Sequence, residues 1–269
     1  MIRLVATDLD GTLLPSGHAI PERTLDAIRR VQDAGALVVP VTARPPRSVG
    51  GVAREFGIRG SAICGCGAFL YDLDSDRVIE SRAIPSGAAL EYVAALRSVL
   101  PGVVFGAQRG LDYFREHGYP TIVAPEFVTV ASIDEVTADP VNVLVAKHPT
   151  MSHAEVFDVA SALPRREGTT VLSTGLCELV AEGVSKASAL EALCARLGIA
   201  RQEVAAFGDL PIDAPMLAWA GQGVAMGNAR DDVKAHADEV APTNDEEGVA
   251  VVLERLLSDG LIGAAPGTA

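Results

Sequence analysis

Two aspartates, Asp8 and Asp10, stand one residue apart directly after an apolar run at residues 2–6. The run predicts a short buried strand of a parallel sheet, so both carboxyl groups follow its carboxyl end on the same side. Two like charges this close repel each other, and a divalent cation is the obvious group to offset them. For the pair alone, a solvated loop that carries two acids by chance is the preferred explanation, so the rest of the chain decides.

Four more polar residues fall where an open α/β sheet binds ligands, outside the carboxyl ends of its strands. Thr42 ends the second predicted strand, Asp209 ends a later one, and Asp213 follows a turn beyond Asp209. Lys186 is expected in the first turn of a helix, where the helix dipole disfavours a cation, so an anion is expected nearby. Each residue alone has an ordinary structural explanation, but their joint placement at one sheet edge predicts a functional site.

Strand and helix signals alternate through the first and final thirds of the chain, which predicts a doubly wound parallel sheet of the α/β class. Apolar runs predict strands at 2–6, 36–45, 61–68, 203–209 and 223–227, with a hairpin at 69–80. Apolar residues at helical spacing predict helices at 21–35, 47–57, 184–198, 211–221 and 245–257. Ser185 is the predicted N-cap of the third helix, and Gly198 its stop.

The middle of the chain breaks this alternation. Strands are predicted near 103–108, 111–115, 141–147, 169–173 and 177–181, with helices at 86–98 and 152–163. Ser86 is the predicted N-cap of the first helix, and Ser152 with Glu155 forms a capping box on the second. Paired strands with few helices indicate an antiparallel sheet covered on one face. We therefore predict an α+β domain of residues 84–182, inserted into a sheet domain of residues 1–83 and 183–269.

The composition excludes several kinds of partner. The 269 residues include 22 Lys and Arg against 35 Asp and Glu, a net charge of −13, which argues against a nucleic-acid surface or an anionic membrane face. Four cysteines in a chain of this length indicate reduced thiols rather than a disulfide framework. No apolar run approaches membrane-spanning length, and a strand beginning at residue 2 leaves no room for a signal peptide. A cytoplasmic location is expected, with residues 260–269 as a frayed tail.

Several motifs resemble those of the haloacid dehalogenase (HAD) superfamily of phosphohydrolases, over nearly the whole chain. They are "DLDGTLL" at 8–14, "VTAR" at 41–44, "VSKASAL" at 184–190 and "FGDLPIDAPML" at 207–217. The long insertion after the second motif, together with "MGNA" at 226–229 and "TNDEEGVA" at 243–250, resembles the Cof-type branch with an α/β cap of type C2B. The resemblance implies a Rossmann-like catalytic core, with residues 84–182 as a cap that selects the substrate.

The resemblance also implies a role for each site residue. Asp8 would be the nucleophile that becomes an aspartyl phosphate, and Asp10 the general acid and base. Mg²⁺ would be held by Asp8, by the backbone carbonyl of Asp10 and by Asp209, with Asp213 behind them. The predicted phosphate-binding residues are Leu9, Thr42, Ala43 through its amide, and Lys186. The implied activity is a Mg²⁺-dependent phosphatase of small phosphorylated metabolites, foremost sugar phosphates, that acts as a monomer or small homo-oligomer.

Three positions depart from the pattern of the branch. Ile212 and Cys66 stand where it carries asparagine, and Ala43 stands where it carries glycine. Loss of one hydrogen bond to a charged group costs about 1.5–3 kcal/mol, so turnover is expected to be weakened. Two alternatives stay open: a phosphosugar mutase or phosphotransferase that begins with the same step, and a weakly active or non-catalytic phosphate-binding relative. A receiver-type signalling module ranks low because it would be roughly half this length and would lack the inserted domain.

Overall fold

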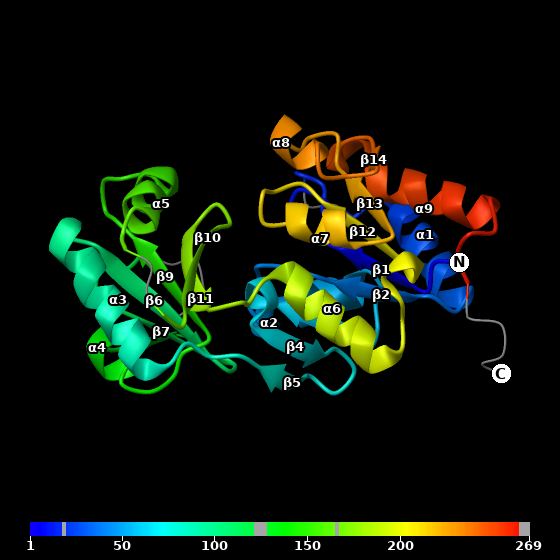
Figure 1. The fold of residues 1–269 in the computed structure, drawn as a ribbon. Coiled ribbons are helices and arrows are strands. Elements are labelled where there is room, and N and C mark those ends of the chain that lie inside the picture. The colour runs from blue at the N-terminus through cyan, green and yellow to red at the C-terminus, as the bar shows by residue number, and fades with distance from the viewer. Residues whose placement is uncertain (18–19, 121–127, 165–166, 264–269) are drawn as a thin grey trace. The chain divides into compact units, whose positions relative to one another are not determined.

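The computed structural model describes residues 1–17, 20–120, 128–164 and 167–263, and it divides the chain into two compact units (Figure 1). Unit 1 comprises Met1–Arg77 and Ser185–Ala269, and unit 2 comprises Val78–Val184. The sequence predicts the two junctions at 83/84 and 182/183. The assignment of the units as catalytic core and cap stays a prediction.

Unit 1 is built on a parallel sheet with the strand order β14-β13-β12-β1-β2. The bounds of these strands are β1 Leu4–Thr7, β2 Leu37–Pro40, β12 Val204–Gly208, β13 Gln222–Ala225 and β14 Glu239–Val240. Strand β1 lies between β2 and β12, pairing Leu4 with both Leu37 and Val204. Every residue of β1 and β12 is buried, as a strand covered on both faces requires. The predicted α/β class with a doubly wound parallel sheet is confirmed.

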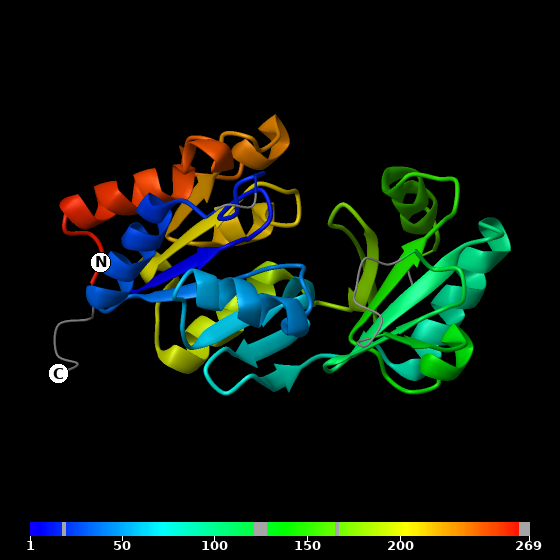
Figure 2. The same cartoon turned by 180° about the vertical axis from the view of Figure 1, so that it is seen from behind.

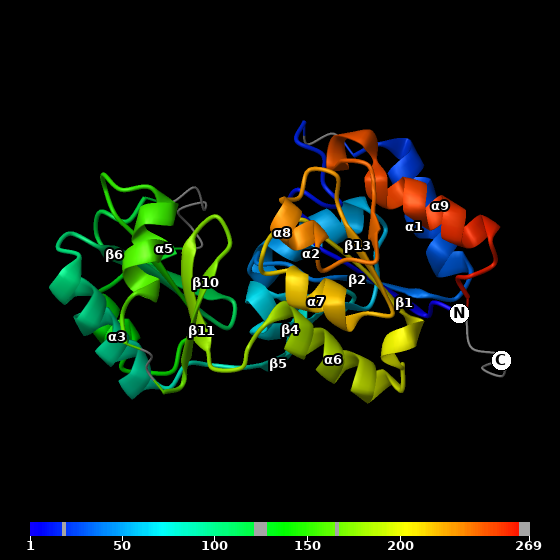
Figure 3. The same cartoon turned by 45° about the horizontal axis from the view of Figure 1, so that its top comes forward.

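Helices cover both faces of this sheet (Figures 1 and 3). On one face, Leu4 and Ala6 share a hydrophobic core with Leu190, Leu193 and Met216 of α6 and α7. Helices α1 and α9 lie side by side on the other face. The bounds are α1 Glu22–Asp33, α2 Pro46–Glu55, α6 Lys186–Leu197, α7 Ala214–Trp219, α8 Asp231–Lys234 and α9 Gly248–Ser258. Short 3-10 turns at Arg201–Glu203 and Asn244–Glu246 precede β12 and α9.

The third predicted strand is shorter than expected. Strand β3 ends at Cys64, because Gly65, Cys66 and Gly67 all adopt positive φ (Cys66 at 58°) and leave the extended conformation in a tight turn. Strand β3 (Ser61–Cys64) is the first strand of a small sheet with β4 (Phe69–Asp72) and β5 (Arg77–Ser81). Strands β4 and β5 correspond to the hairpin predicted at 69–80. The small sheet meets the parallel sheet through a single bridge between Val41 and Ile63.

Helix limits are largely as predicted, with two corrections, and the predicted tail is corrected at Ile262. Ser185 caps α6 and Gly198 ends it at φ 64°, as expected. Ser86 is not an N-cap, because Pro85 occupies that position with its extended backbone and Ser86 begins the helix. The predicted helix at 211–221 begins only at Ala214, since the preceding residues form a turn. Ile262, in the predicted tail, is buried and bridges Ile2; residues 264–269 lie outside the described part of the chain.

Unit 2 contains a six-stranded sheet with the order β10-β11-β9-β6-β7-β8 (Figure 2). Its strands are β6 Val104–Arg109, β7 Asp112–Arg115, β8 Val128–Val130, β9 Val143–Lys147, β10 Thr169–Ser173 and β11 Cys177–Ala181. Neighbours are antiparallel, as predicted, except that β7 and β8 are parallel.

Helices of unit 2 pack on one face of that sheet. The side chains of Phe105, Leu144 and Leu179 share a core with Leu96 and Val156 of the helices. The helices are α3 Ser86–Val99, α4 Ile133–Val136 and α5 His153–Ser161. Ser152 and Glu155 form the predicted capping box of α5, whereas α4 and β8 carry too few residues to have given a periodic signal.

All four cysteines are free and buried, so none of them forms a disulfide. Among the described residues, no helix has the length and hydrophobicity needed to cross a membrane.

Candidate active site

The carboxyl ends of β1 and β12 bring three aspartates together. The strands are paired in register up to Thr7 and Phe207, so the segments that follow them begin side by side. Each of Asp8, Asp209 and Asp213 offers a carboxylate oxygen, and these oxygens all lie within 4.8 Å of one another. Asp8 and Asp213 are buried and Asp209 is partly buried. The fold thus concentrates negative charge at one point of the sheet edge.

Lys186, the first residue of α6, places its amine inside this cluster. Its Nζ atom lies 2.7 Å from Asp213 Oδ1 and 3.0 Å from Asp8 Oδ1, and the side chain is only 1% exposed. The anions expected from a lysine at a helix N-terminus are therefore these two carboxylates. One ammonium against three carboxylates leaves about two negative charges for a bound cation to neutralise.

Asp213 is committed to protein donors at both of its oxygens. Oδ1 accepts from Lys186, and Oδ2 accepts from the backbone N–H groups of Asp209 (3.1 Å) and Leu210 (2.9 Å). Its carboxylate thereby closes the turn after β12 and fixes the lysine at the same time. This arrangement suits the predicted place of Asp213 behind the metal ligands rather than among them.

Burial dominates the electrostatics of the cluster. It raises the pKa of Asp8 to about 7, with Lys186 opposing and Asp213 adding to the rise. Burial also raises the pKa of Asp209 to about 6, against the hydrogen bond from Thr12. For Lys186 burial alone would lower the pKa, but the carboxylates of Asp213 and Asp8 outweigh it and raise the pKa. Shifted pKa values of neighbouring buried groups are typical of functional sites.

Two carboxylates keep an oxygen open toward the centre of the cluster. Asp8 Oδ1 accepts from Lys186 and from the Leu9 N–H at 2.7 Å, and Asp209 Oδ1 accepts from Thr12 Oγ1 at 2.7 Å. The Oδ2 atom of each accepts no hydrogen bond from any residue that the structure describes. Hard carboxylate oxygens of this kind are the ligands that Mg²⁺ takes, so the residues present fit the predicted cation.

Asp10 is not one of the three clustered carboxylates, and it pairs with Arg44. The guanidinium donates from Nε to Oδ2 at 2.7 Å and from its terminal nitrogen to Oδ1 at 2.6 Å. The Asp10 side chain is 56% exposed. Sequence analysis gave Arg44 no role in the site, although its position in the "VTAR" motif offered a signal.

The predicted phosphate-binding residues differ in which of their hydrogen-bonding groups already have a partner within the protein. Thr42 is buried; its N–H donates to the Ile63 carbonyl (2.9 Å) and its Oγ1 accepts from the Arg44 N–H (3.1 Å). The Ala43 N–H donates to none of the residues described here, so it is available to a ligand. The Leu9 N–H, by contrast, is taken by Asp8.

Two of the departures from the family pattern lie near these groups. Cys66 is buried and its N–H donates to the Thr42 carbonyl (3.1 Å), in the turn that supports the strand end. Cys66 also makes a minor contribution to the raised pKa of Lys186. Ile212 is half-buried in the turn between Asp209 and Asp213.

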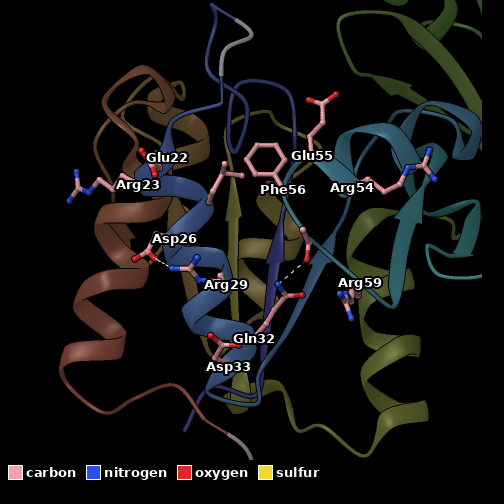
Figure 4. Close-up of a pocket in the computed structure, with 12 residues that line it drawn as sticks. Glu22, Arg23, Asp26, Arg29, Gln32, Asp33, Arg54, Glu55, Phe56 and Arg59 are labelled. Carbon is pink, nitrogen blue, oxygen red and sulfur yellow. Dashed lines mark hydrogen bonds and ion pairs between the residues drawn. The ribbon is translucent and has the colours of Figure 1, made fainter.

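A groove of about 950 Å³ lies elsewhere in unit 1, along α1 and the end of α2 (Figure 4). Gln32 bridges its floor with a hydrogen bond to the Gly57 carbonyl. Four arginines and four acidic residues line it, namely Arg23, Arg29, Arg54, Arg59, Glu22, Asp26, Asp33 and Glu55. These charges balance, and the group of three potential metal ligands found among the described residues lies at the sheet edge, which remains the candidate active site.

Comparison with known proteins identifies the family of the chain. A family model described as haloacid dehalogenase-like hydrolase matches residues 5–253. The chain is 30% identical to phosphatase YwpJ of Bacillus subtilis, over 95% of this chain and 100% of that one. It is 32% identical to the 5-amino-6-(5-phospho-D-ribitylamino)uracil phosphatase YitU of the same organism, over 95% and 97%. A solved haloacid dehalogenase-like hydrolase from Bacteroides thetaiotaomicron superposes with a TM-score of 0.79 at 28% identity, over 95% and 100%.

Proposed function

The chain belongs to the haloacid dehalogenase-like hydrolases, and we propose that it is a Mg²⁺-dependent phosphatase of small phosphorylated metabolites that acts through an aspartyl phosphate. Sugar and sugar-alcohol phosphates are the foremost substrate class, since YitU is named for a phosphorylated ribityl compound. The observation that carries the proposal is the buried cluster in which Lys186 contacts Asp8 and Asp213 beside Asp209.

Mg²⁺ would be held by the open oxygens of Asp8 and Asp209 and by the Asp10 carbonyl. When bound, it neutralises charge on the carboxylates and on the phosphoryl oxygens. Lys186 adds a fixed positive charge from the opposite side of Asp8. The Thr42 hydroxyl and the Ala43 N–H supply uncharged donors for the remaining phosphoryl oxygens, and all of these groups are in place before the substrate arrives.

In the first step the Asp8 carboxylate attacks phosphorus, and the bond from phosphorus to the ester oxygen breaks. Asp10 gives a proton to that departing oxygen. In the second step a water molecule attacks the phosphorus of the aspartyl phosphate while Asp10 takes its proton. The bond between Asp8 and phosphorus then breaks, phosphate leaves, and both aspartates return to their starting states.

Arg44 contacts both carboxylate oxygens of Asp10, and we assign to this pair the orientation of Asp10 for its part in both steps. The Asp10 side chain is more than half exposed, so a substrate can reach it. Selection among phosphate esters is assigned, as in the sequence-based prediction, to residues 84–182.

The test is a panel of phosphorylated metabolites assayed for free phosphate with Mg²⁺, with chelator and with the Asp8→Asn variant. Mg²⁺-dependent release that the variant lacks is the expected result. Metal-independent turnover would contradict the proposed site. Conversion of a sugar phosphate to its isomer without free phosphate would identify a mutase, and binding without turnover would identify a phosphate-binding relative.

A further inference from the structure

The loop that follows Asp10, residues 11–16, accepts hydrogen bonds from two asparagines near the other end of the chain. Asn228 Nδ2 donates to the Gly11 carbonyl at 2.8 Å, across 217 positions of sequence. Asn244 Nδ2 donates to the Leu14 carbonyl at 3.0 Å, across 230 positions. These asparagines belong to the "MGNA" and "TNDEEGVA" motifs, to which neither catalysis nor phosphate binding assigns a role.

The two asparagines are also joined to each other. The Asn244 N–H donates to Asn228 Oδ1 at 3.1 Å, so the donor and the acceptor of the Asn228 amide are both in use. A third link follows at Ser16, whose N–H and Oγ donate to the Asp245 carboxylate at 2.7 and 3.0 Å. An amide is the side chain that can donate to one main-chain segment while accepting from another.

The fastened loop lies directly against the predicted metal ligand Asp209. Gly11 has φ 78°, and a Cβ atom at that position would come within 2.4 Å of Asp209 Oδ2. The next residue, Thr12, donates its hydroxyl to Asp209 Oδ1 at 2.7 Å. Any shift of the loop is therefore transmitted to the Asp209 carboxylate, and Asp10 adjoins the same loop.

We propose that Asn228 and Asn244 are positioning residues, which hold loop 11–16 so that Asp209 and the Asp10 carbonyl keep the geometry that Mg²⁺ requires. This inference rests on the proposed function, because it takes a Mg²⁺ site at Asp8 and Asp209 as given. Mg²⁺ demands near-octahedral ligands at about 2.0–2.1 Å, whereas Ca²⁺ accepts a looser shell at about 2.3–2.6 Å. Loosening the loop consequently weakens Mg²⁺ binding more than Ca²⁺ binding.

The experiment is a calorimetric titration of the metal-free full-length protein with MgCl₂ and with CaCl₂. Asn228 is exposed, so Asn228→Ala leaves no cavity and the variant keeps nearly the unfolding temperature of the parent. Its Kd for Mg²⁺ is expected to rise by about fivefold, the equivalent of one hydrogen bond, and its Kd for Ca²⁺ by clearly less. Asn228→Asp keeps an acceptor for Asn244 but loses the donor to Gly11, and it should change the ratio of the two Kd values in the same direction.

Gln32→Glu serves as the matched control. The Gln32 amide likewise donates to a main-chain carbonyl in unit 1, that of Gly57 at 3.1 Å, but in the groove along α1 (Figure 4). The variant Gln32→Glu introduces the same charge as Asn228→Asp, and it should leave the ratio of Mg²⁺ to Ca²⁺ affinity at the parent value.

The inference is overturned if both Asn228 variants keep the parent's ratio of the Kd for Mg²⁺ to the Kd for Ca²⁺. It is also overturned if both cations lose affinity equally, because that result would indicate general loosening of the fold. A parent protein that binds neither cation removes the Mg²⁺ site of the proposed function, and the inference with it. If the parent binds Mg²⁺ and the Asn228 variants keep its ratio of affinities, the positioning role fails while the proposed Mg²⁺ site stands.

Discussion

Arg44 holds Asp10 by both carboxylate oxygens, in a bidentate pair with bonds of 2.7 and 2.6 Å. The same arginine donates its backbone N–H to Thr42 Oγ1, so one residue connects the predicted acid and base with a predicted phosphate-binding residue. Its carbonyl in turn accepts from the Gly65 N–H, which anchors the arginine on the turn after β3. Bidentate pairs of this kind fix orientation as well as charge.

Replacement of Arg44 by alanine is therefore expected to lower kcat by about tenfold to a hundredfold, because Asp10 loses charge-assisted hydrogen bonds that orient it. Added guanidinium ion should restore part of the rate, which a purely structural defect would not allow. Steady-state kinetics with and without guanidinium hydrochloride at low concentration measure both effects. Arg23→Ala is the control, since Arg23 makes an equally bidentate pair with Glu254 on the surface and should leave kcat unchanged. An unaltered kcat in Arg44→Ala would remove Arg44 from the catalytic machinery.

The second prediction concerns Asp8, the proposed nucleophile. Asp8→Asn should abolish phosphate release, because an amide cannot attack phosphorus, whereas the isosteric change leaves the fold intact. Asp10→Ala should be comparably inactive but should let phosphate accumulate on Asp8 with substrates whose leaving groups need no proton. Intact-mass measurement after rapid quenching detects that adduct. Turnover retained by purified Asp8→Asn, or an adduct on another residue, would refute the assignment of Asp8.

The raised pKa values predict a pH dependence of stability. Burial raises the pKa of Asp8 to about 7 and that of Asp209 to about 6. A carboxyl whose pKa is higher in the folded than in the unfolded state stabilises the fold below its unfolded pKa, and this contribution is lost as the pH rises through the folded pKa. The unfolding temperature of the metal-free protein should thus fall between pH 5 and about pH 8 more steeply than that of Asp8→Asn.

Mg²⁺ should reverse that loss, because it binds the deprotonated carboxylates of the folded state. The stabilisation produced by Mg²⁺ over chelator is accordingly expected to grow as the pH rises through 6 and 7. Thermal unfolding at a series of pH values, with Mg²⁺ and with chelator, measures both trends. Parallel curves for the parent and Asp8→Asn would show that Asp8 is not the group responsible.

Ile212 provides a test of a departure from the family pattern. Ile212→Asn should restore a donor at the phosphate edge and raise kcat/KM by about tenfold to a hundredfold. A fall in activity without loss of stability would instead make Ile212 a residue that shapes the pocket for an apolar part of the substrate. No change would mean that the side chain points away from the site, which would contradict the alignment of "FGDLPIDAPML" at this position.

The sequence by itself determined the features that depend on neighbouring residues. Continuous apolar runs located β1 and β12, a serine N-cap and a terminal glycine bounded α6, and the capping box at Ser152 began α5. It also placed the acidic residues at strand ends, because the position of a residue after a strand is a local property. The motifs then identified the family through residue types at fixed spacings.

Only the tertiary structure decided which side chains pair. The salt bridge from Arg44 to Asp10, the bond from Lys186 to Asp213 and the bond from Asn228 to Gly11 join positions that are 34, 27 and 217 residues apart. Such partners are selected by the packing of whole strands and helices against one another, which no local pattern encodes. The same reason explains β3, whose apolar run predicted a place in the parallel sheet but which pairs along its length with β4 and touches the parallel sheet at the bridge between Val41 and Ile63.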